Sequence, residues 1–344
     1  MSSAINRIPD FPPVIEPVPS DIIRPLWSVM IPTYNCISYV KRTIESVLAQ
    51  DPGRENMQIK VIDDFSTDGD IGALVKRIGK GRVEFFQQEC NKGSLRNFET
   101  CLNHSKGHYV HILHGDDIVY KGFYQEIENL STLFPEAGAS FTNFTFIDHN
   151  DRDTGIINPN ILEEPGVVKD LLVLLAGKQM IQPPAMVVKR TTYESVGSFY
   201  AVHFGEDWEM WARIAAKFPV AYSPKNLAGY RIGHGAGISY ESMLTGQNLF
   251  DIAKVIDIIQ DYLPAEIRQK YKKMASEYYA IYCIRIANSL LLTDKKAAYK
   301  QIEGAWKMSK SPKTLFWILR FYMLLIFRLK QMKQYYLQIK SSSY

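Results

Sequence analysis

The sequence predicts an α/β fold with a mostly parallel sheet flanked by helices. From residue 27 to about residue 240, short runs rich in β-branched and aromatic residues alternate with helical patterns, which is typical of βαβ units. Hydrophobic residues make up 46% of the 344 residues, so the chain can bury a large core. After about residue 245 the strand-like runs stop, which predicts a C-terminal helical appendage.

Residues 1–25 are expected to form an extended N-terminal arm. Prolines punctuate this segment, and each proline fixes φ and removes a backbone donor. The segment holds no apolar run of the length that a signal peptide needs. The four cysteines show no C-x-x-C pair and no zinc-ligand spacing. We therefore expect a bacterial-type cytoplasmic protein with reduced thiols.

Four predicted strands and three predicted helices follow the arm in strict alternation. In chain order, these elements span residues 27–32, 38–50, 59–63, 71–79, 83–88, 95–105 and 108–113. Strands separated by helices in this way pair in parallel. In such sheets, ligands bind beyond the carboxyl ends of the strands.

The C-terminal part of the chain is predicted to be helical and basic. Residues 251–344 carry 17 Lys and Arg against 7 Asp and Glu, although the whole chain has a net charge of only +4. This imbalance predicts different partners for the two parts of the chain. Within residues 278–312, two helical patterns join near Thr293 and Asp294, which predicts a helical hairpin.

Residues 314–330 form a strongly apolar stretch that resembles a membrane helix. The stretch is shorter than the roughly 20 apolar residues that a span needs, and Arg320 lies near its centre. Two interpretations stay open. The first is a buried helix or one that forms a homo-oligomer, and the second is an in-plane helix that contacts the inner face of the membrane through residues 314–333.

Polar and acidic groups follow three of the predicted strands. Asn35, Asp64 and the pair Asp116 and Asp117 come directly after them, and the topology would bring them to one edge. A single Asp after a strand is commonly a helix cap or a turn residue, but three such groups at one edge indicate a binding site. Paired carboxylates suit Mg²⁺ or Mn²⁺, which is typically held by one or two carboxylates together with phosphate oxygens.

Four ordered motifs resemble those of family 2 glycosyltransferases with the Rossmann-like GT-A fold. They are SVMIPTYN at 28–35, VIDDFSTDGD at 61–70, the segment 91–117 that ends in HILHGDD, and the segment 183–214 that ends in GEDWEMWARI. The resemblance implies an N-terminal arm followed by a glycosyltransferase domain and a helical region. Their expected bounds are 1–25, 26–245 and 246–344.

The resemblance implies a nucleotide-sugar site at the strand ends. Asp64 would accept a hydrogen bond from the base, Arg96 would lie near the base or phosphates, and Asp116 would bind the ribose or sugar. Arg231 would pair with phosphate through its planar donors. The full set of expected nucleotide-sugar contacts is Pro32, Thr33, Tyr34, Asn35, Asp64, Arg96, Asp116 and Arg231.

The resemblance also implies a divalent cation, Mn²⁺ or Mg²⁺, bound by Asp117 in a D-x-D-like motif. His234 is the second expected metal ligand, in a segment similar to the Y-R-x-H segment of the family, with Gly233 as one additional residue. Many relatives carry Asp where this chain has His114. The metal or nucleotide contact at that position is therefore left open.

Glu206 and Asp207 begin a helical pattern. One interpretation is an acidic first turn that complements the helix dipole. The other is a catalytic base, because inverting sugar transfer needs a carboxylate that takes the proton of the acceptor hydroxyl. The resemblance assigns this role to Asp207, with Glu206 as a neighbour that orients the acceptor.

The expected function is that of an inverting, metal-dependent hexosyltransferase. It would move a sugar from a UDP-sugar to a glycan or lipid-linked acceptor in cell-surface polysaccharide synthesis. The alternative is a non-catalytic sugar-nucleotide or glycan-binding module, which His114 suggests but which Asp117 and Asp207 oppose. The sequence lacks the glycine-rich motifs of nicotinamide and P-loop sites and the basic phosphate loop of a nucleotidyltransferase. No nucleic-acid partner is expected.

Overall fold

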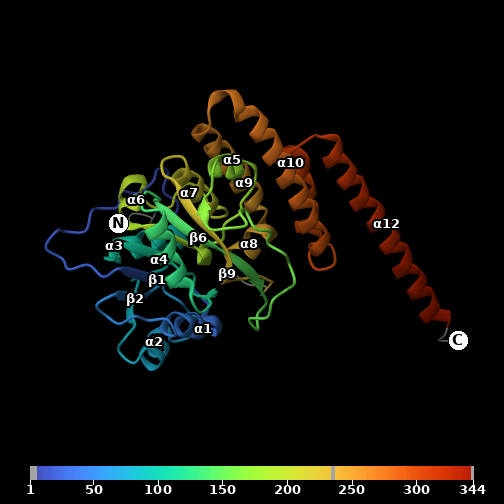
Figure 1. Cartoon of the computed structure of the whole chain (residues 1–344). Helices are drawn as coiled ribbons and strands as arrows, with labels where there is room; N and C mark the ends of the chain where they lie inside the picture. The colour runs from blue at the N-terminus through green and yellow to red at the C-terminus, as the bar shows by residue number, and fades with distance from the viewer. Residues whose placement is uncertain (1–5, 234–236, 342–344) are drawn as a thin grey trace, which may run out of the picture.

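The computed structural model describes residues 6–233 and 237–341, with side chains described except at Ile238 and 328–341 (Figure 1). In this part of the chain, nine strands form one sheet in the order β3-β2-β1-β4-β8-β6-β9-β5, with β7 paired to β9. Helices flank the sheet, and the C-terminal helices gather on one side of the molecule (Figure 1). The predicted α/β class is confirmed.

The first four strands form the parallel half of the sheet. They are β1 (Trp27–Thr33), β2 (Met57–Asp63), β3 (Glu84–Gln87) and β4 (Tyr109–Ile112), and each pairs in parallel with its neighbour. Every residue of β1 is buried, as expected for a central strand covered on both faces. The crossover helices are α1 (Ile37–Leu48), α2 (Ile71–Gly79) and α3 (Ser94–His104).

The other half of the sheet mixes strand directions. Its strands are β5 (Ile118–Val119), β6 (Ala139–Ile147), β7 (Gly166–Val167), β8 (Met186–Lys189) and β9 (Val220–Arg231). β8 runs antiparallel to both β4 and β6, whereas β6 and β9 pair in parallel. The strands are connected by α4 (Phe123–Leu133), α5 (Leu171–Gly177), a 3₁₀ turn (Pro183–Ala185), α6 (Arg190–Val196) and α7 (Glu206–Ala215).

The described residues after the sheet form five helices. They are α8 (Ile238–Thr245), α9 (Gln247–Tyr262), α10 (Ala265–Leu290), α11 (Lys295–Met308) and α12 (Pro312–Ser341). The predicted hairpin is confirmed: α10 and α11 join at Thr293 and Asp294, and the Asp294 side chain accepts the Ala297 amide as a helix cap. Sheet residues such as Phe141 and helix residues such as Ile284 belong to one hydrophobic cluster, so these helices complete the core.

Helix α12 extends away from the body of the molecule (Figure 1). Its first turns pack against the body, because Phe321 is buried and Ile318 nearly so. No helix within the described residues is both long and apolar enough to cross a membrane.

The described part of the N-terminal arm, residues 6–25, lies extended along the body. Its backbone carbonyls accept hydrogen bonds from backbone amides of the body. For example, the Ser198 amide donates to the Pro13 carbonyl at 2.8 Å, and the Ala201 amide donates to the Pro9 carbonyl at 3.0 Å. The side chain of Ile15 is buried in the main hydrophobic cluster. The arm is therefore a fixed part of the fold.

Candidate active site

The ends of β1, β2 and β4 meet at one edge of the sheet. The Asp64 amide donates to the Thr33 carbonyl at 2.8 Å, and the Gly115 amide donates to the Pro32 carbonyl at 3.0 Å. These bonds tie the segments after β2 and β4 to the end of β1. The structure thus brings together the polar strand ends that the sequence predicted to share an edge.

The side chains of the P-T-Y-N segment divide between internal bonds and solvent. The Thr33 hydroxyl donates to Asp63 Oδ1 at 2.9 Å, and Asn35 Oδ1 accepts the Thr67 amide at 2.8 Å. Tyr34, by contrast, is 48% exposed. Within this segment, Tyr34 is thus an exposed side chain that a ligand can reach.

Asp64 is buried beneath the loop that precedes α3. Its two carboxylate oxygens accept the backbone amides of Lys92 at 2.7 Å and Gly93 at 2.8 Å. Burial raises the pKa of Asp64, and the two amides counter this rise. Each carboxylate oxygen has a second lone pair, so Asp64 can also accept an N–H from a ligand.

Arg96 contacts the N-terminal arm. Its Nε donates to the Asn6 carbonyl at 2.8 Å, and its Nη1 pairs with Glu99 at 2.6 Å. Arg96, Asn6, Glu99 and Lys92 line part of a surface hollow of about 350 Å³. Arg96 therefore fastens the arm beside the Asp64 loop.

His114, Asp116 and Asp117 form a tight group after β4. Their potential ligand atoms all lie within 4.8 Å of one another. The group is fixed from below, because the Arg231 amide donates to Asp117 Oδ1 and the Thr43 hydroxyl to the Asp117 carbonyl, both at 2.8 Å. Burial and the charge of Asp116 raise the pKa of Asp117 well above its usual range.

The second carboxylate oxygen of Asp117, Oδ2, is buried and has no hydrogen-bond partner among the described residues. A buried carboxylate oxygen without a partner is costly, and a cation would supply the missing partner. Two carboxylates and one imidazole are donors that suit Mn²⁺ and, less strongly, Mg²⁺. The residues present therefore fit a divalent cation.

His114 is a candidate ligand that the sequence analysis left unassigned. Its ring stacks on Phe98 with the centroids 5.2 Å apart and the planes within 8°. Burial lowers the pKa of His114, which favours the neutral ring that binds metals. In the sequence, its position two residues before Asp116 was the feature that could have indicated this role. The other expected histidine, His234, lies outside the described residues.

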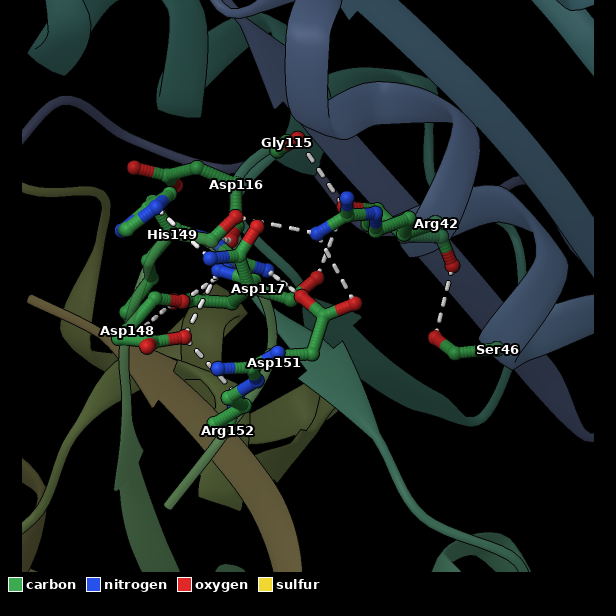
Figure 2. A network of polar contacts seen from close by, with 12 residues as sticks. Arg42, Ser46, Gly115, Asp116, Asp117, Asp148, His149, Asp151 and Arg152 are labelled. Carbon is green, nitrogen blue, oxygen red and sulfur yellow. Dashed lines mark hydrogen bonds and ion pairs between the residues drawn. The ribbon is translucent and has the colours of Figure 1, made fainter. Parts of the chain in front are cut away.

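Arg231 is buried at the end of β9 and binds to the protein on several sides. Its Nε donates to the Asp116 carbonyl at 2.6 Å, and its Nη atoms bond to the Asp148 carbonyl and the Asp151 carboxylate. Asp151 also pairs with Arg42 at 3.0 Å. Figure 2 shows Asp148 and Asp151 gathered beside Asp116 and Asp117, with Arg42 on the other side of the group. In this structure Arg231 thus anchors the turn that carries the acidic pair.

Glu206 and Asp207 occupy the first turn of α7, after Gly205 with φ at 87°. Asp207 accepts the Trp208 amide at Oδ1 and the Gln179 side-chain amide at Oδ2, both at 2.7 Å. Burial raises the pKa of Asp207 to about 6. Burial and the charge of Asp207 also raise the pKa of Glu206 well above its usual range.

Two tyrosines relate this acidic turn to the rest of the site. Burial, followed by the charges of Asp117, Asp207 and Asp116, raises the pKa of Tyr230, so Tyr230 lies within electrostatic reach of both acidic groups. The second tyrosine is Tyr279, whose hydroxyl accepts the backbone amide of Gln179 at 2.9 Å. Sequence reasoning missed Gln179, because nothing in its local pattern distinguishes it from another loop residue.

Comparisons with known proteins show which sequences this chain resembles. The model of the family described as "Glycosyl transferase family 2" matches residues 28–197. An uncharacterized glycosyltransferase of Rickettsia felis is 27% identical over 59% of this chain and 34% of its own length. The uncharacterized protein MT1568 of Mycobacterium tuberculosis is 26% identical over 71% of this chain and 79% of its own length. The chain thus spans about a third of the Rickettsia relative and most of the mycobacterial one.

Among solved structures, S. aureus TarS 1-349 is similar in fold. It has a TM-score of 0.58 at 16% identity and covers 82% of this chain and 79% of its own. The same protein in complex with UDP-GlcNAc also has a TM-score of 0.58, at 17% identity, over 81% of this chain and 79% of its own. This likeness supports the fold.

Proposed function

Because residues 28–197 of this chain belong to glycosyl transferase family 2, we propose that the protein transfers a sugar from a UDP-sugar to a hydroxyl group. The acceptor would be a glycan or lipid-linked saccharide in cell-surface polysaccharide synthesis. The observation that carries the proposal is the presence of two acidic groups, the half-buried Asp116 with the buried Asp117 and the half-buried Asp207, whose charges both act on Tyr230. The UDP-GlcNAc complex of TarS supports the choice of a UDP-linked donor.

The donor would lie along the edge formed by the ends of β2, β1 and β4. Asp64 would accept the N–H of the base, and Tyr34 is exposed beside it. His114, Asp116 and Asp117 would hold the divalent cation at the diphosphate end. When bound, such a cation supplies positive charge that stabilises the departing diphosphate.

Asp207 would serve as the general base of an inverting reaction. Its pKa of about 6 keeps the carboxylate charged at neutral pH while leaving it basic enough to accept a proton. The carboxylate takes the proton of the acceptor hydroxyl while the acceptor oxygen bonds to the anomeric carbon. The bond between that carbon and the diphosphate oxygen breaks on the opposite face, so the configuration inverts.

The test compares sugar transfer and UDP affinity in the same preparation of the Asp207→Asn variant. We expect UDP affinity to stay within about twofold and transfer to fall about 10²-fold or more, the scale of lost general-base assistance. Asp257→Asn is the matched control, because Asp257 lies in an exposed ion pair with Lys272 on the helical region.

Three other results would contradict parts of the proposal. If the variant transfers sugar at the normal rate, Asp207 is an acidic residue of the first turn of α7 that complements the helix dipole and is not the base. UDP binding without transfer or donor hydrolysis in the wild type, over a panel of UDP-sugars, would identify the non-catalytic binding module. Absence of nucleotide binding would refute the proposed function itself.

A further inference from the structure

The N-terminal arm follows a defined path to the nucleotide end of the site. Successive arm carbonyls accept hydrogen bonds from the body: Pro25 from the His108 amide at 3.2 Å, Pro13 from Ser198, and Pro9 from Ala201. The buried side chain of Ile15 adds an apolar anchor. These contacts run from the start of β4 toward the segment that precedes α7, so the position of the residues before Pro9 is set by the fold.

This path brings Arg7 against the loop that binds Asp64. Arg7 Nη2 donates to Asn91 Oδ1, and Arg7 Nε would lie 3.0 Å from a Cβ atom added to Gly93. The Gly93 amide is one of the two that donate to Asp64. The neighbouring carbonyl of Asn6 is held by Arg96 at 2.8 Å, so two separate contacts keep this part of the arm on the loop.

Arg7 lies at the base end of the site and not at the diphosphate end. Asp64 follows β2 and the Asp116–Asp117 pair follows β4, with β1 between them. Neighbouring strands are about 4.8 Å apart, so the two groups are separated by roughly 10 Å. Two residues after Arg7, the Pro9 carbonyl accepts the Ala201 amide at 3.0 Å. The arm therefore connects the nucleotide loop with the segment that leads to Asp207.

The chemistry of the pair Arg7 and Asp64 matches the edge of a uracil base. Uracil presents an N–H between two carbonyl oxygens. Asp64 can accept from the N–H, and the exposed guanidinium of Arg7 carries five donors in a planar fork that can reach an adjacent carbonyl. Cytosine presents an unprotonated ring nitrogen and an amino group in place of the O4 carbonyl, but it keeps the O2 carbonyl. It would therefore oppose Asp64, and it would oppose Arg7 where Arg7 faces the O4 side of the base.

We propose that the N-terminal arm forms part of the donor site and that Arg7 contacts the base, which makes it a specificity-determining residue for a uracil nucleotide. This inference rests on the proposed function. It assigns a ligand-binding role to a segment that precedes the glycosyltransferase domain in the sequence.

The experiment measures the binding of UDP, UMP and CDP to the full chain by calorimetry in the presence of Mn²⁺. The variants are Arg7→Gln and Arg7→Lys, with Arg54→Gln as matched control, because Arg54 is exposed and bonds to a backbone carbonyl, that of Gly81. We expect Arg7→Gln to lower the affinities for UDP and UMP by the same factor, roughly tenfold for one lost charge-assisted bond. Affinity for CDP should change little, and Arg7→Lys should restore part of the loss.

Thermal unfolding of each variant without nucleotide checks that the arm stays in place. Unchanged UDP affinity in Arg7→Gln, alongside weakened binding in Asp64→Ala, would show that the arm is only structural, and the proposed function would stand. An equal loss for UDP and CDP would assign Arg7 to a group that both nucleotides share, the O2 carbonyl or the phosphates, and would overturn its role in uracil specificity. If the wild type binds none of the three nucleotides, the proposed function fails, and this inference fails with it.

Discussion

Asp117 combines a fixed oxygen with an unsatisfied one. Its Oδ1 accepts the Arg231 amide, while Oδ2 is buried and has no partner among the described residues. The first oxygen orients the carboxylate, and the second is the atom that a cation would complete. The carboxylate is thus held in place before any ligand arrives, which lowers the cost of binding.

We predict that Asp117→Asn removes the Mn²⁺-dependent part of UDP binding and abolishes sugar transfer. The amide oxygen can still accept the Arg231 amide, so the fold should be kept while the negative charge is lost. Thermal shift with UDP, measured with and without Mn²⁺, gives a readout that does not depend on activity. If Mn²⁺ stabilises the UDP complex of the variant as much as that of the wild type, Asp117 is not a ligand.

Gln179 is a positioning residue for Asp207. It donates to Asp207 Oδ2 at 2.7 Å, and its backbone amide donates to Tyr279 of α10. Other titratable groups within electrostatic reach of Asp207 are Glu206, Tyr230 and Tyr279 itself. A hydrogen bond to the charged carboxylate favours that form, so Gln179 holds down a pKa that burial raises.

We predict that Gln179→Met moves the acidic limb of the pH–rate profile to higher pH. Transfer needs the charged carboxylate, so wild-type activity should fall as pH drops through about 6, the pKa of Asp207. Loss of the bond raises that pKa further. The readout is kcat/KM against pH, with UDP affinity as a check and Gln125→Met, at an exposed position on α4, as control. An acidic limb that stays at the wild-type pH would mean that Gln179 has only a packing role.

At the scale of elements, α12 presents an apolar surface to solvent. Phe316 is 59% exposed and Phe327 63%, and Leu319 and Met323 are exposed between them. The opposite face, with Phe321, packs against the body. Exposed apolar stretches of this kind mark interaction sites. The sequence left open a buried or oligomer-forming helix and an in-plane membrane helix. These exposed side chains do not agree with a helix buried on all sides, and the oligomer contact and the membrane helix both place a partner on this face.

We predict that the chain pellets with anionic phosphatidylglycerol vesicles at low salt and not with neutral phosphatidylcholine vesicles, because the region of α12 is basic in sequence. Leu319→Glu combined with Met323→Glu should abolish pelleting without unfolding the protein, whereas Ile157→Glu, at another exposed apolar position, should not. Absence of pelleting, together with a dimer that the double variant dissociates, would establish the oligomer contact instead.

The elements also show what the sequence could predict. The alternation of β1 to β4 with α1 to α3 could be predicted because each strand lies in a short run rich in β-branched and aromatic residues and the helices between them have a helical period. The two-residue strands β5 and β7 leave no such pattern, and the antiparallel placement of β8 depends on pairing with β4 and β6, which are distant in the sequence. Pairing of this kind is decided by tertiary packing.

At the scale of the whole molecule, the site residues that could be predicted belong to local sequence motifs. The site residues that the sequence analysis missed are defined by contacts between distant parts of the chain. Asp64, Asp117 and Asp207 stand in motifs that a reader of the sequence can find. Gln179 meets Asp207 across 28 positions, and Arg7 meets Asn91 across 84. No local sequence pattern predicts such contacts, because the packing of the complete core determines where the arm and the loop after α5 lie.

The order in which the two hydrophobic clusters can be completed follows from their membership. One cluster includes one face of β1 and β2, and its residues lie between Trp27 and Ala228 in the sequence. The other includes Ile15 at one end and Phe321 at the other, and it surrounds Trp208, next to Asp207. During synthesis on the ribosome, where N-terminal parts fold first, the first cluster can close while the last helices are still being made. The surroundings of Asp207 are therefore the last part of the site to mature, after almost the whole chain has emerged.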